Sequence, residues 1–334
     1  MQLIKAKYDI LEQGEGLEGI YKAIELPGRI CYHSQDRITE DSAKPFVERL
    51  MRDNHGAPLE HGTVYLYLYY DSFCSTKKTD YVIKEFSEYY NWSDVVDYLG
   101  ARYRANEYSH VKTIRRIDIS GTDNNHITEV FITTNLRVLF ENGWMDDLQF
   151  LSEPKPQHEK RISVKFTLDR FTGEEYLRHR KGSFNRESTR YINYTKDKHG
   201  NGNINMILPP WLSDEKEKIC IFNEDYYTKL RKEFGNETVN NWMAIDVWWF
   251  TLKTCEWGYN TLVSNFKWQP QQARTVLPCA ISSPLIVTMF VKDWKHFFNL
   301  RAKGTTGAPH PQAKELAQPL MEEFIKRGLI DENF

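Results

Sequence analysis

The sequence predicts an α+β protein, in which strands and helices mix without the regular strand–helix–strand alternation of an α/β fold. Short segments rich in β-branched and aromatic residues, such as VYLYLYY at Val64–Tyr70, are typical of strands. Longer segments with apolar residues at helical spacing lie around them, mostly in the second half of the chain. The 334 residues, of which 40% are apolar, suffice for a substantial core.

The first half of the chain predicts both kinds of element, each from its local pattern. Up to residue 72 we expect a strand at Leu3–Ile10, a helix at Gly16–Leu26, a helix at Thr39–Asp53 that begins with the capping signal T-E-D-S, and a strand at Val64–Tyr70. Between residues 73 and 159 the pattern is looser. There we expect an aromatic helix at Tyr81–Tyr98, a strand at Ile127–Thr134 and a helix at Glu141–Leu151.

The second half of the chain predicts mainly helices. Strands are expected at Arg161–Leu168 and Leu285–Phe290, and an ordered polar loop at Gly182–Tyr191. Helices are expected at Glu174–Arg180, Glu215–Glu233, Val239–Trp257, Gln269–Val276, Asp293–Leu300 and Gln312–Arg327.

Composition argues against several classes of function. The net charge is −2, whereas a general nucleic-acid or membrane-surface binder would carry a basic excess. No apolar run approaches the roughly 20 residues that span a bilayer, and the first residues lack the apolar core of a secretion signal. The five cysteines are scattered without C-x-x-C spacing, so we expect neither a disulfide framework nor a metal site, and a cytoplasmic location.

Against this neutral background, the segment RHRKGSFNRESTRY (Arg178–Tyr191) holds five positive side chains and one negative. On a regular helix, Arg178 and Arg180 would project about 200° apart. They would then serve two anionic ligands, or one of them would pair with a carboxylate. Arginine forks and backbone N–H groups near Gly182 are suited to phosphate. The alternative is a solvated basic surface with ion pairs.

The order of residues in this segment, with three further motifs, is specific. R-H-R is followed by seven residues, Ser188, and the continuation S-x-R-Y. The further motifs are HGAPLEHGTVYL at His55–Leu66, QQARTVLP at Gln271–Pro278, and DWKHFFNLR at Asp293–Arg301 followed by HPQAKEL at His310–Leu316. Together they resemble the flavin-dependent thymidylate synthase (ThyX) family. The segments TTNLRVLFENG and HEKRISVKFT resemble a longer branch of it.

This resemblance implies a ThyX-like mixed sheet with packed helices, in a single catalytic domain over residues 1–334. Residues 73–159 would be an insertion, and their aromatic content is too high for a flexible linker. The family makes dTMP from dUMP, takes a methylene from methylenetetrahydrofolate, and uses FAD that NADPH reduces. The resemblance also implies a homotetramer with active sites between subunits, small-molecule partners, and neither nucleic acid nor membrane.

The resemblance assigns roles to individual residues. Arg301 matches the arginine on the carbonyl edge of uracil; it favours loss of the ring N–H proton through its charge, because a guanidinium cannot readily act as a base. The implied substrate-binding residues are Glu175, Arg178, Arg186, Glu187, Ser188, Thr189, Arg190, Arg274 and Arg301. The implied flavin-binding residues are His55, Ala57, Glu60, Arg178, His179, Arg180, Arg186, Lys292, His296 and His310.

Several positions depart from the family pattern. Arg186 stands where Gln or Glu is usual, and Glu175 where Gln often contacts the nucleotide. A carboxylate at 175 is ill-placed beside a phosphate, so we expect it to turn away, pair with an arginine, or contact the sugar. Phe290, Lys292 and His296 replace Asn, Arg and Asn near the flavin. These departures leave open another pyrimidine nucleotide, UMP or dCMP, as substrate.

Other interpretations also stay open at this point. The protein could be a non-catalytic nucleotide-binding homologue. The cysteine-dependent thymidylate synthase chemistry is less well supported, since Cys279 in L-P-C-A is followed by alanine where that chemistry needs histidine. Without the motifs, His55 and His61 read as surface histidines, Glu60 as an arginine partner, and Arg274 as part of an ion pair.

Overall fold

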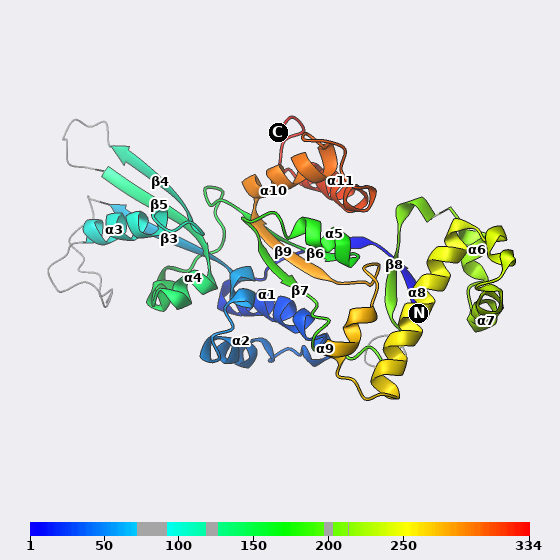
Figure 1. The fold of residues 1–334 in the computed structure, drawn as a ribbon. Coiled ribbons are helices and arrows are strands. Elements are labelled where there is room, and N and C mark those ends of the chain that lie inside the picture. Colours follow the sequence, from blue (N-terminus) through cyan, green and yellow to red (C-terminus); the bar gives the residue numbers. More distant parts are fainter. Residues whose placement is uncertain (72–91, 118–125, 197–202, 213) are drawn as a thin grey trace.

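The computed structural model describes residues 1–71, 92–117, 126–196, 203–212 and 214–334. At its centre lies a four-stranded antiparallel sheet in the order β2-β6-β9-β7 (Figure 1). These strands are β2 (Lys7–Leu11), β6 (Arg161–Thr167), β9 (Leu285–Phe290) and β7 (Ser183–Arg186). All six residues of β9 are buried, because helical segments cover both faces of the sheet.

Two groups of helices provide this cover. On one side, α10 (Val291–Phe298) and α11 (Pro311–Lys326) pack aromatic and aliphatic side chains against Val164, Val287 and Met289. On the other side lie α1 (Gly16–Cys31), α2 (Ala43–Arg52) and the 3-10 turn η2 (Ala57–His61). The chain enters β7 from α5 (Arg170–Tyr176).

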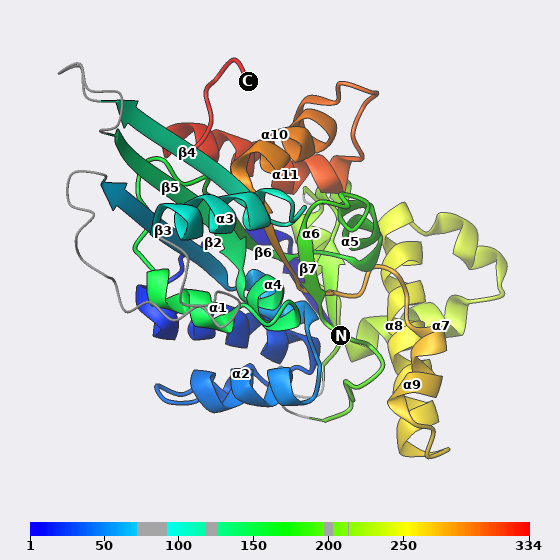
Figure 2. The same ribbon diagram turned by 90° about the vertical axis from the view of Figure 1, so that its left-hand side faces the viewer.

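A second sheet, in the order β3-β5-β4, projects from the central body in Figure 1 and faces the viewer in Figure 2. It contains β3 (Thr63–Asp71), β5 (His126–Asn135) and β4 (His110–Ile117), and α3 (Trp92–Arg104) lies across it. Leu66, Leu68 and Ile132 belong to one core with Leu99 and Tyr103 of α3. This core continues into α4 (Leu136–Glu141) and η4 (Met145–Phe150).

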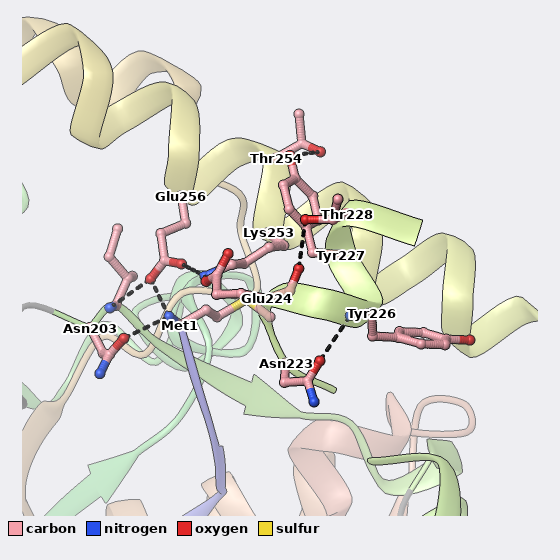
Figure 3. A network of polar contacts seen from close by, with 11 residues as sticks. Met1, Asn203, Asn223, Glu224, Tyr226, Tyr227, Thr228, Lys253, Thr254 and Glu256 are labelled. Atoms are coloured by element: carbon pink, nitrogen blue, oxygen red, sulfur yellow. Dashed lines mark hydrogen bonds and ion pairs between the residues drawn. The ribbon is translucent and has the colours of Figure 1, made fainter. Parts of the chain in front are cut away.

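A third unit surrounds the long helix α8 (Ala244–Ser264). Its two strands, β1 (Gln2–Lys5) and β8 (Asn205–Leu208), run parallel. Figure 3 shows Lys253 of α8 between Glu224 and Glu256. Its Nζ lies 2.6 Å from Glu224 Oε1 and 2.8 Å from Glu256 Oε2. Glu256 also accepts a hydrogen bond from the Ile204 N–H. The shorter elements are η1 (Gln35–Arg37), η5 (Pro210–Leu212), α6 (Lys216–Cys220), α7 (Glu224–Glu233), η6 (Glu237–Asn241), α9 (Pro270–Ala273), η7 (Arg274–Val276) and the π-helical turn η8 (Asn299–Lys303).

The α+β prediction is confirmed, and the strands predicted from residue 64 onward lie where expected, as parts of β3, β5, β6 and β9. The strand predicted at Leu3–Ile10 is instead two strands, because the chain leaves one sheet after Lys5 and joins another at Lys7. Of the helix predicted at Tyr81–Tyr98, only residues 92–98 lie within the described residues, as part of α3.

Several helix boundaries were wrong, and local hydrogen bonds explain two of them. The helix predicted from Thr39 begins at Ala43, since the Ser42 hydroxyl accepts from the Thr39 N–H at 2.8 Å and closes a turn. The helix predicted at Glu215–Glu233 is interrupted at Asn223, whose side chain accepts from the Tyr226 N–H and starts α7. The other corrected helices are Glu141–Leu151, which is the 3-10 turn η4 after α4, and Val239–Trp257, which is shifted to Ala244–Ser264.

Candidate functional site

The R-H-R segment lies in a turn, not on the helix predicted at Glu174–Arg180. Asp169 accepts from the Thr172 N–H at 3.0 Å and starts α5 at Arg170, and the helix ends at Tyr176. The Gly182 N–H donates to the carbonyl of His179 at 3.1 Å. A Cβ at Gly182 would lie 2.7 Å from Phe184. This glycine therefore permits close packing, and its N–H is not free for the anion nest that the sequence suggested.

The polar segment after this turn was expected to be a loop, but it contains strand β7. The turn with Arg178 and Arg180 precedes β7, and the segment 187–190 follows it. The basic residues of the segment are therefore divided between the two ends of a strand. Arg186, on β7 itself, pairs with Glu174 at 2.9 Å.

Arg301 lies at the first end of β7, where three contacts hold its guanidinium. Its Nη1 is 2.5 Å from Glu175 Oε2, its Nη2 donates to the Glu175 carbonyl at 2.8 Å, and its Nε donates to His179 Nε2 at 3.1 Å. Glu175 thus pairs with an arginine, one of the three placements expected for it. The turn η8 that carries Arg301 is π-helical, a form common at functional sites.

His179 is neutral in this arrangement. Burial, with smaller contributions from Arg301 and His296, lowers the pKa of its imidazole to about 4. Because Nε2 accepts from Arg301, the ring proton resides on Nδ1. His179 can therefore orient the guanidinium without competing with it as a cation.

A cavity of about 390 Å³ opens beside this group. Its lining residues come from the R-H-R turn, from β9 and from α10: Arg178, His179, Arg180, Lys181, Met289, Asp293 and His296. Within the described part of the chain, no carboxylate forms an ion pair with Arg178, Arg180 or Lys181. The cavity is therefore strongly cationic and brings together four of the predicted flavin-binding residues.

A second group of predicted residues lies beyond the other end of β7. Arg274 Nη1 contacts Thr189 Oγ1 at 3.4 Å, and Arg190 Nε donates to Gln271 Oε1 at 3.2 Å. The Ser188 N–H donates to the carbonyl of Cys31 at 3.1 Å. The Q-x-A-R and S-x-R-Y motifs thus meet in space. Among the described residues, no hydrogen bond or ion pair joins this group to Arg301.

Glu187 is the buried acid of this second group, and it is 5% exposed. Burial raises the pKa of its carboxyl to about 7, although a hydrogen bond from the Tyr194 hydroxyl, at 3.0 Å, opposes the shift. His33 Nδ1 lies 3.4 Å from the other carboxylate oxygen.

The remaining predicted residues are more dispersed. Glu60 forms an ion pair with Arg137, as the simpler interpretation of that residue proposed, and Ala57 lies on the same turn η2. Lys292 follows β9, and His310 lies beside Trp211 with ring centres 5.9 Å apart. His55 borders a larger cavity of about 630 Å³, which none of the other predicted residues lines. We place the candidate site at the smaller cavity because four of the predicted flavin-binding residues line it.

Sequence reasoning did not identify Arg161 and misjudged His61. His61 is 1% exposed, so the surface interpretation was wrong, and burial lowers its pKa to about 3. Its Nδ1 lies 2.7 Å from Thr288 Oγ1. Arg161 donates to the Glu60 carbonyl at 3.0 Å and to Ser183 Oγ at 3.3 Å, so it joins η2 to β7. An arginine at the start of an alternating apolar strand was the signal available.

Two kinds of feature are absent from the described residues. No helix there is long and apolar enough to cross a membrane. No group of three or more His, Cys, Asp or Glu side chains in that part of the chain could hold a metal ion.

Comparisons with known proteins agree on one family. The family model described as thymidylate synthase complementing protein matches residues 154–327. A flavin-dependent thymidylate synthase from Mycolicibacterium gilvum is 28% identical over 135 residues, which are 40% of this chain and 46% of the relative. The chain therefore matches less than half the length of that relative.

Two solved structures are similar at low identity. A UMP/dUMP methylase from Streptomyces cacaoi bound with 5-Br dUMP is 14% identical, with 98% of this chain and 93% of that chain covered and a TM-score of 0.39. Thymidylate synthase X from Helicobacter pylori with FAD and dUMP is 18% identical, with 48% and 66% covered and a TM-score of 0.31. Because the family model matches more than half of the 334 residues, including the R-H-R, S-x-R-Y and Q-x-A-R motifs, the chain belongs to the flavin-dependent thymidylate synthase (ThyX) family.

Proposed function

We propose that this protein converts dUMP to dTMP, with methylenetetrahydrofolate as carbon donor, FAD as hydride carrier and NADPH as reductant. The observation that carries the proposal is Arg301, held by Glu175 and His179 beside a cationic cavity. That combination supplies a fixed positive charge for a pyrimidine ring and cations for a phosphorylated cofactor.

The cavity residues fit a flavin dinucleotide. Arg178, Arg180 and Lys181 are cations without ion-pair partners among the described residues, and they suit the phosphates of FAD. When bound, FAD supplies the hydride chemistry. The predicted flavin residues Glu60 and His55 lie on or next to η2, which Arg161 links to the same region.

Arg301 acts on the pyrimidine by electrostatics. Its guanidinium carries a fixed positive charge, so it stabilises negative charge on the ring when the N3 proton leaves. Neutral His179 fixes the orientation of Nε, and the carbonyl of Glu175 fixes Nη2. Arg178, Arg190 and Arg274 are proposed to bind the phosphate and sugar.

The two groups of residues at the ends of β7 support active sites shared between subunits of a homotetramer. One chain would bind the phosphate through Arg190 and Arg274, and another would present Arg301 to the ring. This arrangement explains why the two groups are not in contact within the described residues of one chain.

Glu175 favours a second candidate, in which the substrate is another pyrimidine nucleotide such as dCMP. A carboxylate accepts from the exocyclic amine of cytosine, which uracil lacks. Pairing with Arg301 at 2.5 Å neutralises this carboxylate, and this favours dUMP.

The experiment is a visible spectrum of the purified protein, followed by binding and turnover with dUMP, UMP and dCMP. A flavin spectrum and a preference for dUMP are expected. Preference for either competitor would overturn the substrate but keep the flavin enzyme. Binding of flavin and nucleotide without turnover would indicate a non-catalytic homologue. Failure to bind FAD at micromolar concentration would contradict the whole proposal.

A further inference from the structure

The second sheet contacts the end of β9, next to the helix that lines the cationic cavity, through the first residue of β4. The ring of His110 lies 6.3 Å from the ring of Phe290, tilted by 55°. Phe290 is 7% exposed and ends β9, immediately before α10. Asp293 and His296 of α10 line the cavity. A residue of the predicted insertion therefore packs against the residue that immediately precedes the cavity-lining helix α10.

Phe290 also contacts two cations. Lys292 Nζ lies 5.2 Å and the Arg161 guanidinium 5.6 Å from the centre of its ring. The phenyl ring thus lies within cation–π distance of Lys292, the second residue of α10. His110, Lys292 and Arg161 gather around one aromatic side chain.

Lys112 adds a further cation to this edge. It lies two residues after His110, so both side chains belong to the same face of β4. Burial lowers the pKa of His110, Glu159 opposes this shift, and Lys292 and Lys112 lower the pKa further. The charges of Lys292, Lys112 and Glu159 therefore all act on His110.

Other described side chains do not occupy the nitrogen donors of this group. Among the described residues, neither Lys112 nor Lys292 forms an ion pair, and the buried Nδ1 of His110 has no hydrogen-bond partner. Although Glu159 raises the pKa of His110, neither the two lysines nor the imidazole forms an ion pair among the described residues, and such a group suits a phosphate. A cavity of about 390 Å³ is also small for a whole dinucleotide, whose phosphates would extend past its rim.

We propose that Lys112 and His110 of β4 complete, with Lys292, a phosphate subsite at the edge of the flavin cavity. The phosphate belongs to the flavin dinucleotide or to the nicotinamide dinucleotide that reduces it. This inference rests on the proposed function, since it requires FAD beside Arg178–Lys181. It gives the inserted sheet a direct part in cofactor binding.

The experiment measures FAD affinity of the apoprotein by flavin fluorescence, for Lys112→Ala and Lys112→Arg. The alanine variant should bind FAD roughly tenfold more weakly, the arginine variant should keep most of the affinity, and the difference should shrink at high salt. Arg115→Ala is the matched control, because it removes one positive charge from the opposite face of the same strand, where Arg115 pairs with Asp97. Its affinity should equal that of the wild type.

A second variant tests His110 without disturbing its packing. His110→Phe keeps a ring against Phe290 but removes the imidazole nitrogens, so it should weaken FAD binding at an unchanged melting temperature. If FAD affinity is unchanged and the KM for NADPH rises instead, the phosphate is that of the reductant. If neither changes in Lys112→Ala, the subsite is wrong although the enzyme is a flavoprotein. A wild-type protein that binds no FAD contradicts the proposed function and this subsite together.

Discussion

Arg301 is positioned before any ligand binds, by a carboxylate, a carbonyl and a neutral imidazole. Fixed donors of this kind need no reorganisation when charge develops on a substrate, and they are commonly the largest catalytic contribution. The pairing with Glu175 also restricts the long arginine side chain to one orientation.

Arg301→Ala is expected to reduce turnover of dUMP by roughly 100- to 1000-fold, the usual effect of losing one such donor. Binding of dUMP should change much less, because the phosphate is assigned to other arginines. Cys279→Ala should keep most of the activity, since no step is assigned to that thiol. Steady-state kinetics and nucleotide binding of both variants provide the measurement. The reverse order of losses would favour a cysteine nucleophile.

Glu187 should make stability depend on pH. Its folded pKa of about 7 lies above the ordinary value of 4.5, so the unfolded chain ionises first as pH rises. The free energy of unfolding should therefore fall between pH 4.5 and about 7 and level off above that. Glu187→Gln removes this component and keeps an acceptor for Tyr194.

Urea unfolding of the apoprotein at pH 5 and pH 8 tests the prediction. From pH 5 to pH 8, the free energy of unfolding of the glutamine variant should rise by roughly 1–3 kcal/mol relative to that of the wild type. Parallel changes in the two proteins would show that Glu187 does not retain its proton on folding.

At the scale of elements, the strand β7 divides the basic residues of the segment 178–191 into two groups, one at each end of the strand. The sequence predicted strands β3, β5, β6 and β9 correctly because their apolar patterns are local. It missed β7, whose sequence S-F-N-R is short, has three polar residues out of four, and is a strand because it pairs with β9. The helix predicted at Glu174–Arg180 was wrong because α5 begins at the Asp169 cap and ends at Tyr176, before Arg178.

The candidate site was predictable to the extent that motifs encode it. The meeting of Arg274 with Thr189, and of Arg301 with Glu175, involves residues from the four recognised motifs or their neighbours. The contribution of Arg161 was not predictable, because a single arginine in a strand gives no sign of which carbonyls it will reach. The limits of the insertion and its role stay predictions.

Gly182 is the point at which the R-H-R turn packs against β9. Gly182→Ala should lower the free energy of unfolding by roughly 1–3 kcal/mol, because the new Cβ would lie 2.7 Å from Phe184 and 2.9 Å from Met289. Gly258→Ala, inside α8 with its nearest neighbour at 3.8 Å, is the control and should be neutral or slightly stabilising. Urea titrations of both variants are the measurement. Equal stability of the two would mean that the turn shifts without cost.

At the scale of the whole molecule, the two groups at the ends of β7 predict complementation between subunits. Arg190→Ala and Arg301→Ala should each be nearly inactive alone. After subunit exchange, about one quarter of shared sites would contain both arginines, so mixing should restore activity. Turnover of dUMP before and after mixing tests this, together with molar mass by light scattering. No recovery despite demonstrated exchange would place both arginines in a site within one chain.

The parallel pairing of β1 with β8 joins residues roughly 200 positions apart in the sequence. During synthesis β1 leaves the ribosome long before its partner β8 is made. The next strand, β2, likewise has no partner until β6 is made. The core around α8 therefore cannot close until well over half of the chain has emerged, and loops of this length fold slowly. In refolding, we expect the sheet β3-β5-β4 to acquire structure first and the α8 unit last, which hydrogen exchange during refolding would resolve.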